Sequence, residues 1–71
     1  MELRKVLARN VRRLRKVKDL SQEELAHMAH IDRTYVSDIE NCKSAATVDV
    51  VEELAAALEV PVTDLLSASI E

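Results

Sequence analysis

The sequence predicts an all-α fold, a compact domain of five short helices. Three observations support this prediction. The chain of 71 residues is rich in Ala, Leu, Glu, Lys and Arg, with one proline and no glycine, and these are helix-forming residues with few helix breakers. Apolar residues recur at spacings of three and four. A chain without glycine also lacks the residue that tight β-hairpin turns favour.

The first helix is predicted over residues 3–18. Its apolar residues form one stripe, made of Leu3, Val6, Leu7, Val11, Leu14 and Val17. Basic side chains fill the rest of the helix surface. That surface is either an ordinary solvated face or a contact for phosphates or anionic lipid, and the pattern leaves both readings open.

The net charge of −3 conceals a strong asymmetry. Residues 1–18 carry eight basic side chains and one acidic one, while residues 19–71 carry two basic and twelve acidic ones. The two parts therefore have charges of +7 and −10. The overall basic charge typical of nucleic-acid binders is absent, so the basic segment is a hint about partners and not a proof.

A second helix is predicted over residues 22–29. Ser21 and Glu24 form a capping box, in which each side chain accepts a hydrogen bond from the backbone N–H of the other residue. Leu20 lies just before the cap and can pack on Leu25 as a hydrophobic staple. The residues expected to face inward are Leu25, Ala26 and Ala29.

The third helix is predicted from Arg33 to about Asn41, after a three-residue turn with Asp32 as its N-cap. Val36 and Ile39 face inward, flanked by Tyr35 or Glu40. The outward residues are Arg33, Thr34, Ser37 and Asp38. Two short helices joined by so short a turn are typical of a helix-turn-helix, and the small Ala26 and Ala29 allow the two helices to cross closely.

Two further helices complete the prediction. Thr47 caps a helix over residues 48–58, with Val51, Leu54, Ala55 and Leu58 inward. Pro61 suits the start of a short fifth helix, which contains Val62, Leu65 and Leu66, and residues 67–71 are expected to fray. Because no repeat or linker interrupts the chain, residues 1–71 are predicted to form a single domain.

Catalytic, metal-binding and membrane-spanning roles are not expected. One cysteine, Cys42, cannot form an internal disulfide, so a reduced, cytoplasmic setting fits best; an ordinary loop thiol is favoured over a redox sensor. With His27 and His30 it does not supply the four ligands of a zinc site. No apolar run approaches the roughly 18 residues of a membrane span, and no secretory signal is present. No cofactor or small-molecule ligand is indicated.

Several segments together resemble the phage-repressor-type (XRE/Cro) helix-turn-helix family. They are residues 14–16, 20–26, 31–37, 39–41, 54–55 with 58, and 64–66, and they include Ser-Gln-Glu-Glu-Leu-Ala and Ile-Glu-Asn. The resemblance covers residues 6–66 and implies a lambda-repressor-like fold. The Arg33-Thr34-Tyr35 segment and the small size also resemble the controller proteins of restriction–modification systems.

The resemblance implies roles for individual residues. The base-reading positions would be Arg33, Thr34, Ser37 and Asp38. The phosphate-contacting positions would be Gln22, Tyr35, Asn41, Lys43 and Ser44. Arg15 and Glu40 would form an ion pair between the first helix and the end of the third.

The sequence departs from the family pattern in its loops. The family usually has glycine at the positions of Asp19, His30, Cys42 and Glu59, and it usually has a proline near Ala46. Asp and His tolerate positive φ, so Asp19 and His30 are mild replacements. Local backbone changes are expected at Cys42 and Glu59.

We therefore expect a sequence-specific transcriptional regulator that binds double-stranded DNA as a homodimer. Its two copies would read half-sites about 34 Å apart through the major groove. The apolar residues left for the dimer interface are Val48, Val62, Leu66 and Ile70. The alternatives are a protein-interaction module on the same scaffold, such as an antitoxin or adaptor, and a membrane-surface role for the first helix.

Overall fold

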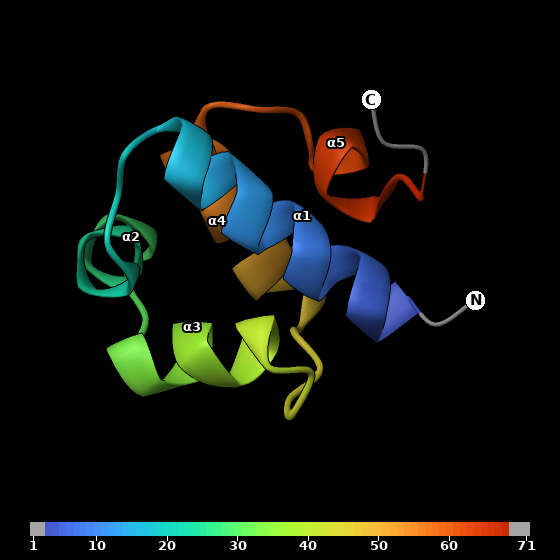
Figure 1. Cartoon of the computed structure of the whole chain (residues 1–71), viewed down its shortest axis with the longest axis horizontal. Coiled ribbons are helices and arrows are strands. Elements are labelled where there is room, and N and C mark those ends of the chain that lie inside the picture. Colours follow the sequence, from blue (N-terminus) through green and yellow to red (C-terminus); the bar gives the residue numbers. More distant parts are fainter. Residues whose placement is uncertain (1–2, 69–71) are drawn as a thin grey trace.

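The structure, a computed structural model, describes residues 3–68 and consists there of five helices without strands. The helices are α1 (Leu3–Val17), α2 (Gln22–Ala29), α3 (Arg33–Glu40), α4 (Val48–Leu58) and α5 (Val62–Leu66). Figure 1 shows α1 crossing in front of α4, with α2 and α3 on one side and α5 on the other. The predicted all-α, five-helix fold is confirmed, and its helix boundaries agree to within a residue or two.

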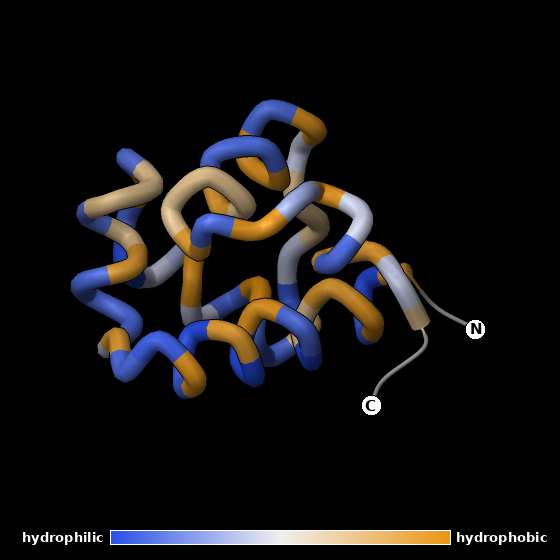
Figure 2. The backbone as a smooth tube through the Cα atoms, turned by 90° about the horizontal axis from the view of Figure 1, so that it is seen from above, coloured by the Kyte–Doolittle hydropathy of each residue, from blue (hydrophilic) through white to orange (hydrophobic). Residues whose placement is uncertain are grey.

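One apolar core joins all five helices. It contains Leu7, Val11, Leu14, Leu25, Ala26, Ala29, Val36, Ile39, Val51, Leu54, Ala55, Ala57, Leu58 and Leu65. The inward residues predicted for α2, α3 and α4 are therefore confirmed. Figure 2 shows apolar and polar residues alternating along the coiled backbone, as expected for helices that bury one face.

The two residues at the ends of the predicted apolar stripe on α1 are exposed, so the prediction that they face the core is wrong. Leu3 is 55% exposed and Val17 is 70% exposed. With 15 residues, α1 is the longest helix, so its ends extend past the shorter helices that cover its middle. Ala8 and Asn10 are buried instead.

The predicted caps are present at two helix starts. In the Ser21–Glu24 capping box, the Glu24 N–H donates to Ser21 Oγ at 3.0 Å, and the Ser21 N–H donates to Glu24 Oε1 at 2.8 Å. Thr47 Oγ1 accepts from the Val50 N–H at 3.1 Å. Asp32 occupies the N-cap position of α3 without a side-chain cap, and Pro61 is the N-cap of α5 and not its first helical residue.

All four residues that replace the family's glycines keep a left-handed backbone. The φ angles of Asp19, His30, Cys42 and Glu59 are 59°, 62°, 62° and 61°. In each case the following N–H donates to the carbonyl five residues earlier, as from Val60 to Ala55 at 3.0 Å. This bond is the signature of the Schellman turn, which needs left-handed backbone at the preceding residue. The backbone changes expected at Cys42 and Glu59 are therefore wrong.

A buried amide joins the first and last helices. Asn10 is 1% exposed, and its Nδ2 donates to the carbonyls of Leu65 at 2.8 Å and Ser67 at 2.9 Å. These carbonyls lie at the end of α5, where a helix has no backbone donors left for its own C=O groups. Asn10 thus fixes the end of α5 against α1.

Candidate DNA-binding surface

The outer face of α3 is the surface best suited to enter a groove of DNA. Val36 and Ile39 are buried in the core at 0% and 1% exposure, whereas Arg33 and Thr34 are exposed. Ser37 and Asp38 are half-buried on the same helix. In Figure 1, α3 lies at the lower edge of the molecule with α1 and α4 above it. An α-helix fits the major groove, which is about 12 Å wide.

The Arg15–Glu40 pair fixes the end of α3 to α1. Arg15 Nε lies 2.7 Å from Glu40 Oε2, and Arg15 Nη2 lies 3.1 Å from Glu40 Oε1, so the contact is bidentate. The two side chains are only 12% and 3% exposed. Hydrogen bonding to Glu40 raises the pKa of Arg15, against the opposing effect of burial. Arg15 Nη1 also donates to the carbonyl of Leu20 at 2.8 Å, just before α2.

Gln22 joins the same network from α2. Its Nε2 donates to Glu40 Oε1 at 3.1 Å, so one carboxylate is bound by side chains from two other helices. The second N–H of this amide and its carbonyl oxygen remain for other contacts. The sequence alone did not predict this bond, because nothing in the spacing of residues 22 and 40 indicates that their side chains meet. The orientation of α2 and α3 is thus held by hydrogen bonds as well as by the core.

The remaining predicted phosphate-contacting residues lie on α3 and in the loop that follows it. Tyr35 Oη donates to the carbonyl of Ala45 at a long 3.5 Å, and Asn41 Nδ2 donates to Ser37 Oγ at 3.4 Å. Lys43 is exposed and Ser44 is half-buried. The predicted phosphate-contacting residues therefore come from the start of α2, from α3 and from this loop.

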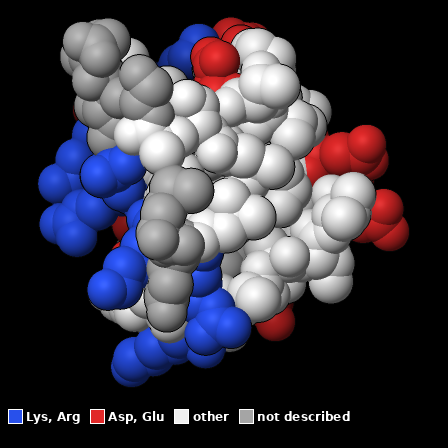
Figure 3. Space-filling model, turned by 90° about the vertical axis from the view of Figure 1, so that its right-hand side faces the viewer, with Lys and Arg blue, Asp and Glu red and all other residues white. Residues whose placement is uncertain are grey.

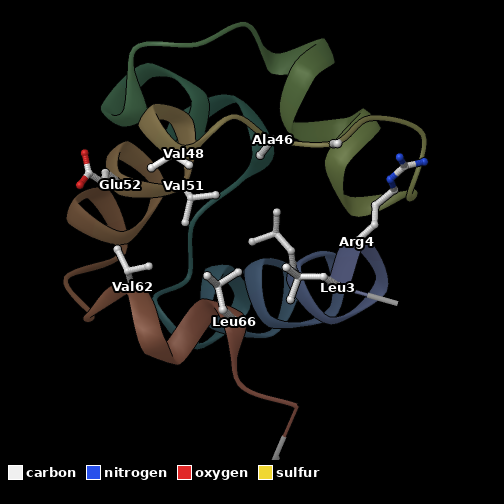
Figure 4. Close-up of a pocket in the computed structure, with 10 residues that line it drawn as sticks. Leu3, Arg4, Ala46, Val48, Val51, Glu52, Val62 and Leu66 are labelled. Carbon is white, nitrogen blue, oxygen red and sulfur yellow. The ribbon is translucent and has the colours of Figure 1, made fainter. Parts of the chain in front are cut away.

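Three of the four predicted dimer residues line a separate groove between α1, α4 and α5. The groove has a volume of about 720 Å³ and is lined by Leu3, Arg4, Leu7, Ala45, Ala46, Val48, Val51, Glu52, Val62 and Leu66. Figure 4 shows Val48, Val62 and Leu66 around it, with Leu3 of α1 on its other wall. Val48 is 77% exposed. Ile70, the fourth predicted interface residue, lies outside the described residues.

Between residues 3 and 68, no group of three or more His, Cys, Asp or Glu side chains is placed to hold a metal ion. Over the same range, no helix is long and apolar enough to cross a membrane.

Comparisons with known proteins agree with this architecture. A helix-turn-helix family model, HTH_3, matches residues 11–65. The chain is 37% identical over 67 residues to the control protein C.SmaI of Serratia marcescens, a match that covers 94% of this chain and 80% of that protein.

Two solved structures are similar over most of the chain. The hypothetical transcription factor NHTF from Neisseria superposes with a TM-score of 0.90 and 45% identity, covering 93% of this chain and 76% of that one. The restriction–modification controller protein C.AhdI from Aeromonas hydrophila gives a TM-score of 0.85 and 32% identity, covering 87% and 94%. The chain therefore belongs to the XRE-type helix-turn-helix family of DNA-binding transcriptional regulators.

Proposed function

We propose that this chain is a sequence-specific regulator of the restriction–modification controller type, which binds a two-fold DNA operator as a homodimer. The observation that carries the proposal is the exposed Arg33–Thr34 end of α3, on a helix fixed by the bidentate Arg15–Glu40 contact. The relatives that are 37% and 32% identical to this chain are named as a control protein and as a restriction–modification controller protein.

The chemistry of α3 suits the reading of bases. The guanidinium of Arg33 can donate two hydrogen bonds to guanine O6 and N7, which discriminates against other bases by about 1–3 kcal/mol. Asp38 can accept from the N4 amino group of cytosine. Thr34 and Ser37 carry hydroxyl groups, which can bond with hydrogen-bond donors or acceptors on the base edges. These four residues form the proposed base-reading set.

The proposed phosphate contacts position the domain without reading sequence. Gln22 Nε2 already donates one hydrogen bond to Glu40 at 3.1 Å, and its second N–H can donate to a phosphate oxygen. Lys43 supplies a positive charge from the loop after α3, and Tyr35, Asn41 and Ser44 complete the set. We propose that Val48, Val62, Leu66 and Ile70 form the dimer interface, which places two copies of α3 against successive turns of one duplex.

Binding titrations on operator and scrambled duplexes at several salt concentrations test the proposal, with the operator taken from DNA upstream of the gene. Arg33→Ala is expected to narrow the affinity gap between the two duplexes. Gln22→Ala is expected to weaken both alike with little change in the salt slope. Lys43→Ala is expected to reduce that slope by about one per subunit.

The outcome for Arg33→Ala decides the placement of α3. An equal loss of affinity for both duplexes would make Arg33 a backbone contact and would refute the base-reading role of α3. A wild-type protein that binds no DNA, even at low salt, would refute the regulator proposal as a whole and favour a protein-interaction module.

A further inference from the structure

The apolar groove carries opposite charges at its two ends. Arg4 of α1 lines one end and Glu52 of α4 lines the other. Figure 4 shows the two charged side chains on opposite sides of the groove, with the valines and leucines between them. Both are exposed, and neither takes part in an ion pair among residues 3–68. Each charge is therefore available to a partner that covers the groove.

The opposite charges at the two ends of the groove are part of a wider separation of basic and acidic side chains on this side of the molecule. Figure 3 looks onto this side of the molecule and shows a largely uncharged surface, with Lys and Arg mainly on its left and lower left and Asp and Glu mainly on its right; side chains of both signs lie together at the top. The basic side chains of residues 1–18 lie mainly on α1, and the exposed acids Asp49, Glu52 and Glu53 lie on α4. A surface with this layout is complementary to itself after a half-turn.

We propose that the groove binds the groove of a second copy, with Arg4 of each copy paired to Glu52 of the other. The proposal rests on the homodimer of the proposed function, and it adds the contact that sets the direction of the two-fold axis. Two such pairs form in each dimer because a two-fold interface repeats every contact.

The direction of the axis follows from the placement of α3. Figures 1 and 3 share their vertical direction, and α3 lies at the lower edge of Figure 1. Only a two-fold axis along that vertical leaves both copies of α3 at the same edge, where one duplex can meet them. A half-turn about this axis exchanges left and right in Figure 3. The basic side of each copy then faces the acidic side of the other.

The same charges oppose a wrongly oriented dimer. A two-fold axis lying horizontally in the plane of Figure 3 would leave left and right unchanged, so that basic would face basic and acidic would face acidic. It would also turn the two copies of α3 to opposite edges. Like-charge contacts at an interface disfavour the wrong partner or register. The charge layout therefore favours the dimer that can bind DNA.

A charge-reversal experiment tests the pairing. Arg4→Glu and Glu52→Arg place two like-charge contacts in each homodimer, and each is expected to weaken self-association by about tenfold at low salt. An equimolar mixture of the two variants is expected to recover the wild-type affinity, because both contacts in the heterodimer are attractive. Sedimentation equilibrium measures the affinities, and native mass spectrometry separates the heterodimer from the homodimers by mass.

Matched controls separate this pair from overall charge. Lys16→Glu makes the same change of charge on α1, about 18 Å along the helix from Arg4, and Glu23→Arg does so on α2. Both are expected to leave the dimer unchanged, with folding checked by circular dichroism. A loss as large as that of Arg4→Glu would assign the effect to net charge and overturn the proposal.

Two further outcomes distinguish the pairing from the dimer itself. If the mixture associates no better than its components, while Leu66→Glu still yields monomers, the groove is the interface but the Arg4–Glu52 pairing is wrong. If the wild-type chain is monomeric at every concentration used for DNA binding, both the pairing and the proposed homodimer are refuted.

Discussion

Replacing Glu59 with glycine is expected to stabilise the protein relative to alanine at the same position. Glu59 ends α4 with a φ of 61°. A residue with a Cβ atom pays about 1–2 kcal/mol for left-handed backbone, and glycine avoids this cost. Glycine also gives the unfolded chain more freedom, which removes about 0.4–1 kcal/mol of the gain. The net expectation is about 0.5–1 kcal/mol in favour of glycine.

The comparison is made with Glu59→Ala because the native side chain has a partner. Lys18 Nζ lies 3.2 Å from Glu59 Oε1, and the Glu59 side chain is 77% exposed. So exposed a pair contributes less than about 1 kcal/mol, but its loss would partly mask the backbone effect. Both variants lose the ion pair, so their difference isolates the cost of the left-handed conformation.

Thermal unfolding followed by circular dichroism at one fixed protein concentration measures the difference, since self-association makes Tm depend on concentration. The expected gain corresponds to a rise in Tm of about 2–8 °C. Ala56→Gly is the matched control, because Ala56 is exposed in the last turn of α4 and has helical backbone. There glycine is expected to cost about 1 kcal/mol. A Glu59→Gly protein less stable than Glu59→Ala would refute the reasoning.

Three other perturbations probe the remaining contacts. Glu40→Ala is expected to lower Tm more than Glu23→Ala, because it leaves the mostly buried Arg15 without its ion-pair partner at a cost of up to about 3 kcal/mol. Equal shifts in Tm for the two variants would contradict this. Leu66→Glu is expected to give monomers in ultracentrifugation, whereas Val17→Glu, outside the groove, is not. In Asn10→Asp the new carboxyl group faces two carbonyl oxygens, so the folded state favours its protonated form and raises its pKa. The free energy of unfolding in urea is therefore expected to approach the wild-type value as pH falls. A difference from wild type that stays constant with pH would contradict this.

The helices were predictable because several independent signals coincide in this sequence. The Ser21–Glu24 capping box marks the start of α2, and the apolar periodicity of α4 places its buried face. Even the left-handed turns follow from the family pattern, although side chains replace glycine there. The Schellman hydrogen bond at Glu59 shows why the turn persists, since the bond from Val60 to Ala55 requires that backbone.

Contacts between distant polar side chains were not predictable from spacing. Asn10 lies among the basic residues of α1, and only the position of α5 gives it two acceptors. The resemblance implies a phosphate-contacting role for Gln22, yet its bond to Glu40 depends on how α2 crosses α3. Periodicity places Leu3 in the core because it cannot tell where the covering helices end. These features depend on tertiary packing, which a local pattern does not encode.

The contact between Asn10 and the end of α5 has a consequence for the time at which this regulator becomes active. The residues that it joins are 55 and 57 positions apart in the chain, so on the ribosome they can meet only after the helices between them have been synthesised. At synthesis rates of about 5–20 residues per second, the residues of α1–α3 are synthesised one to several seconds before those of α5. Because Val62 and Leu66 of α5 line the groove, the groove is incomplete until α5 has been made, and the proposed pairing of two copies through it has to follow synthesis of the recognition helix.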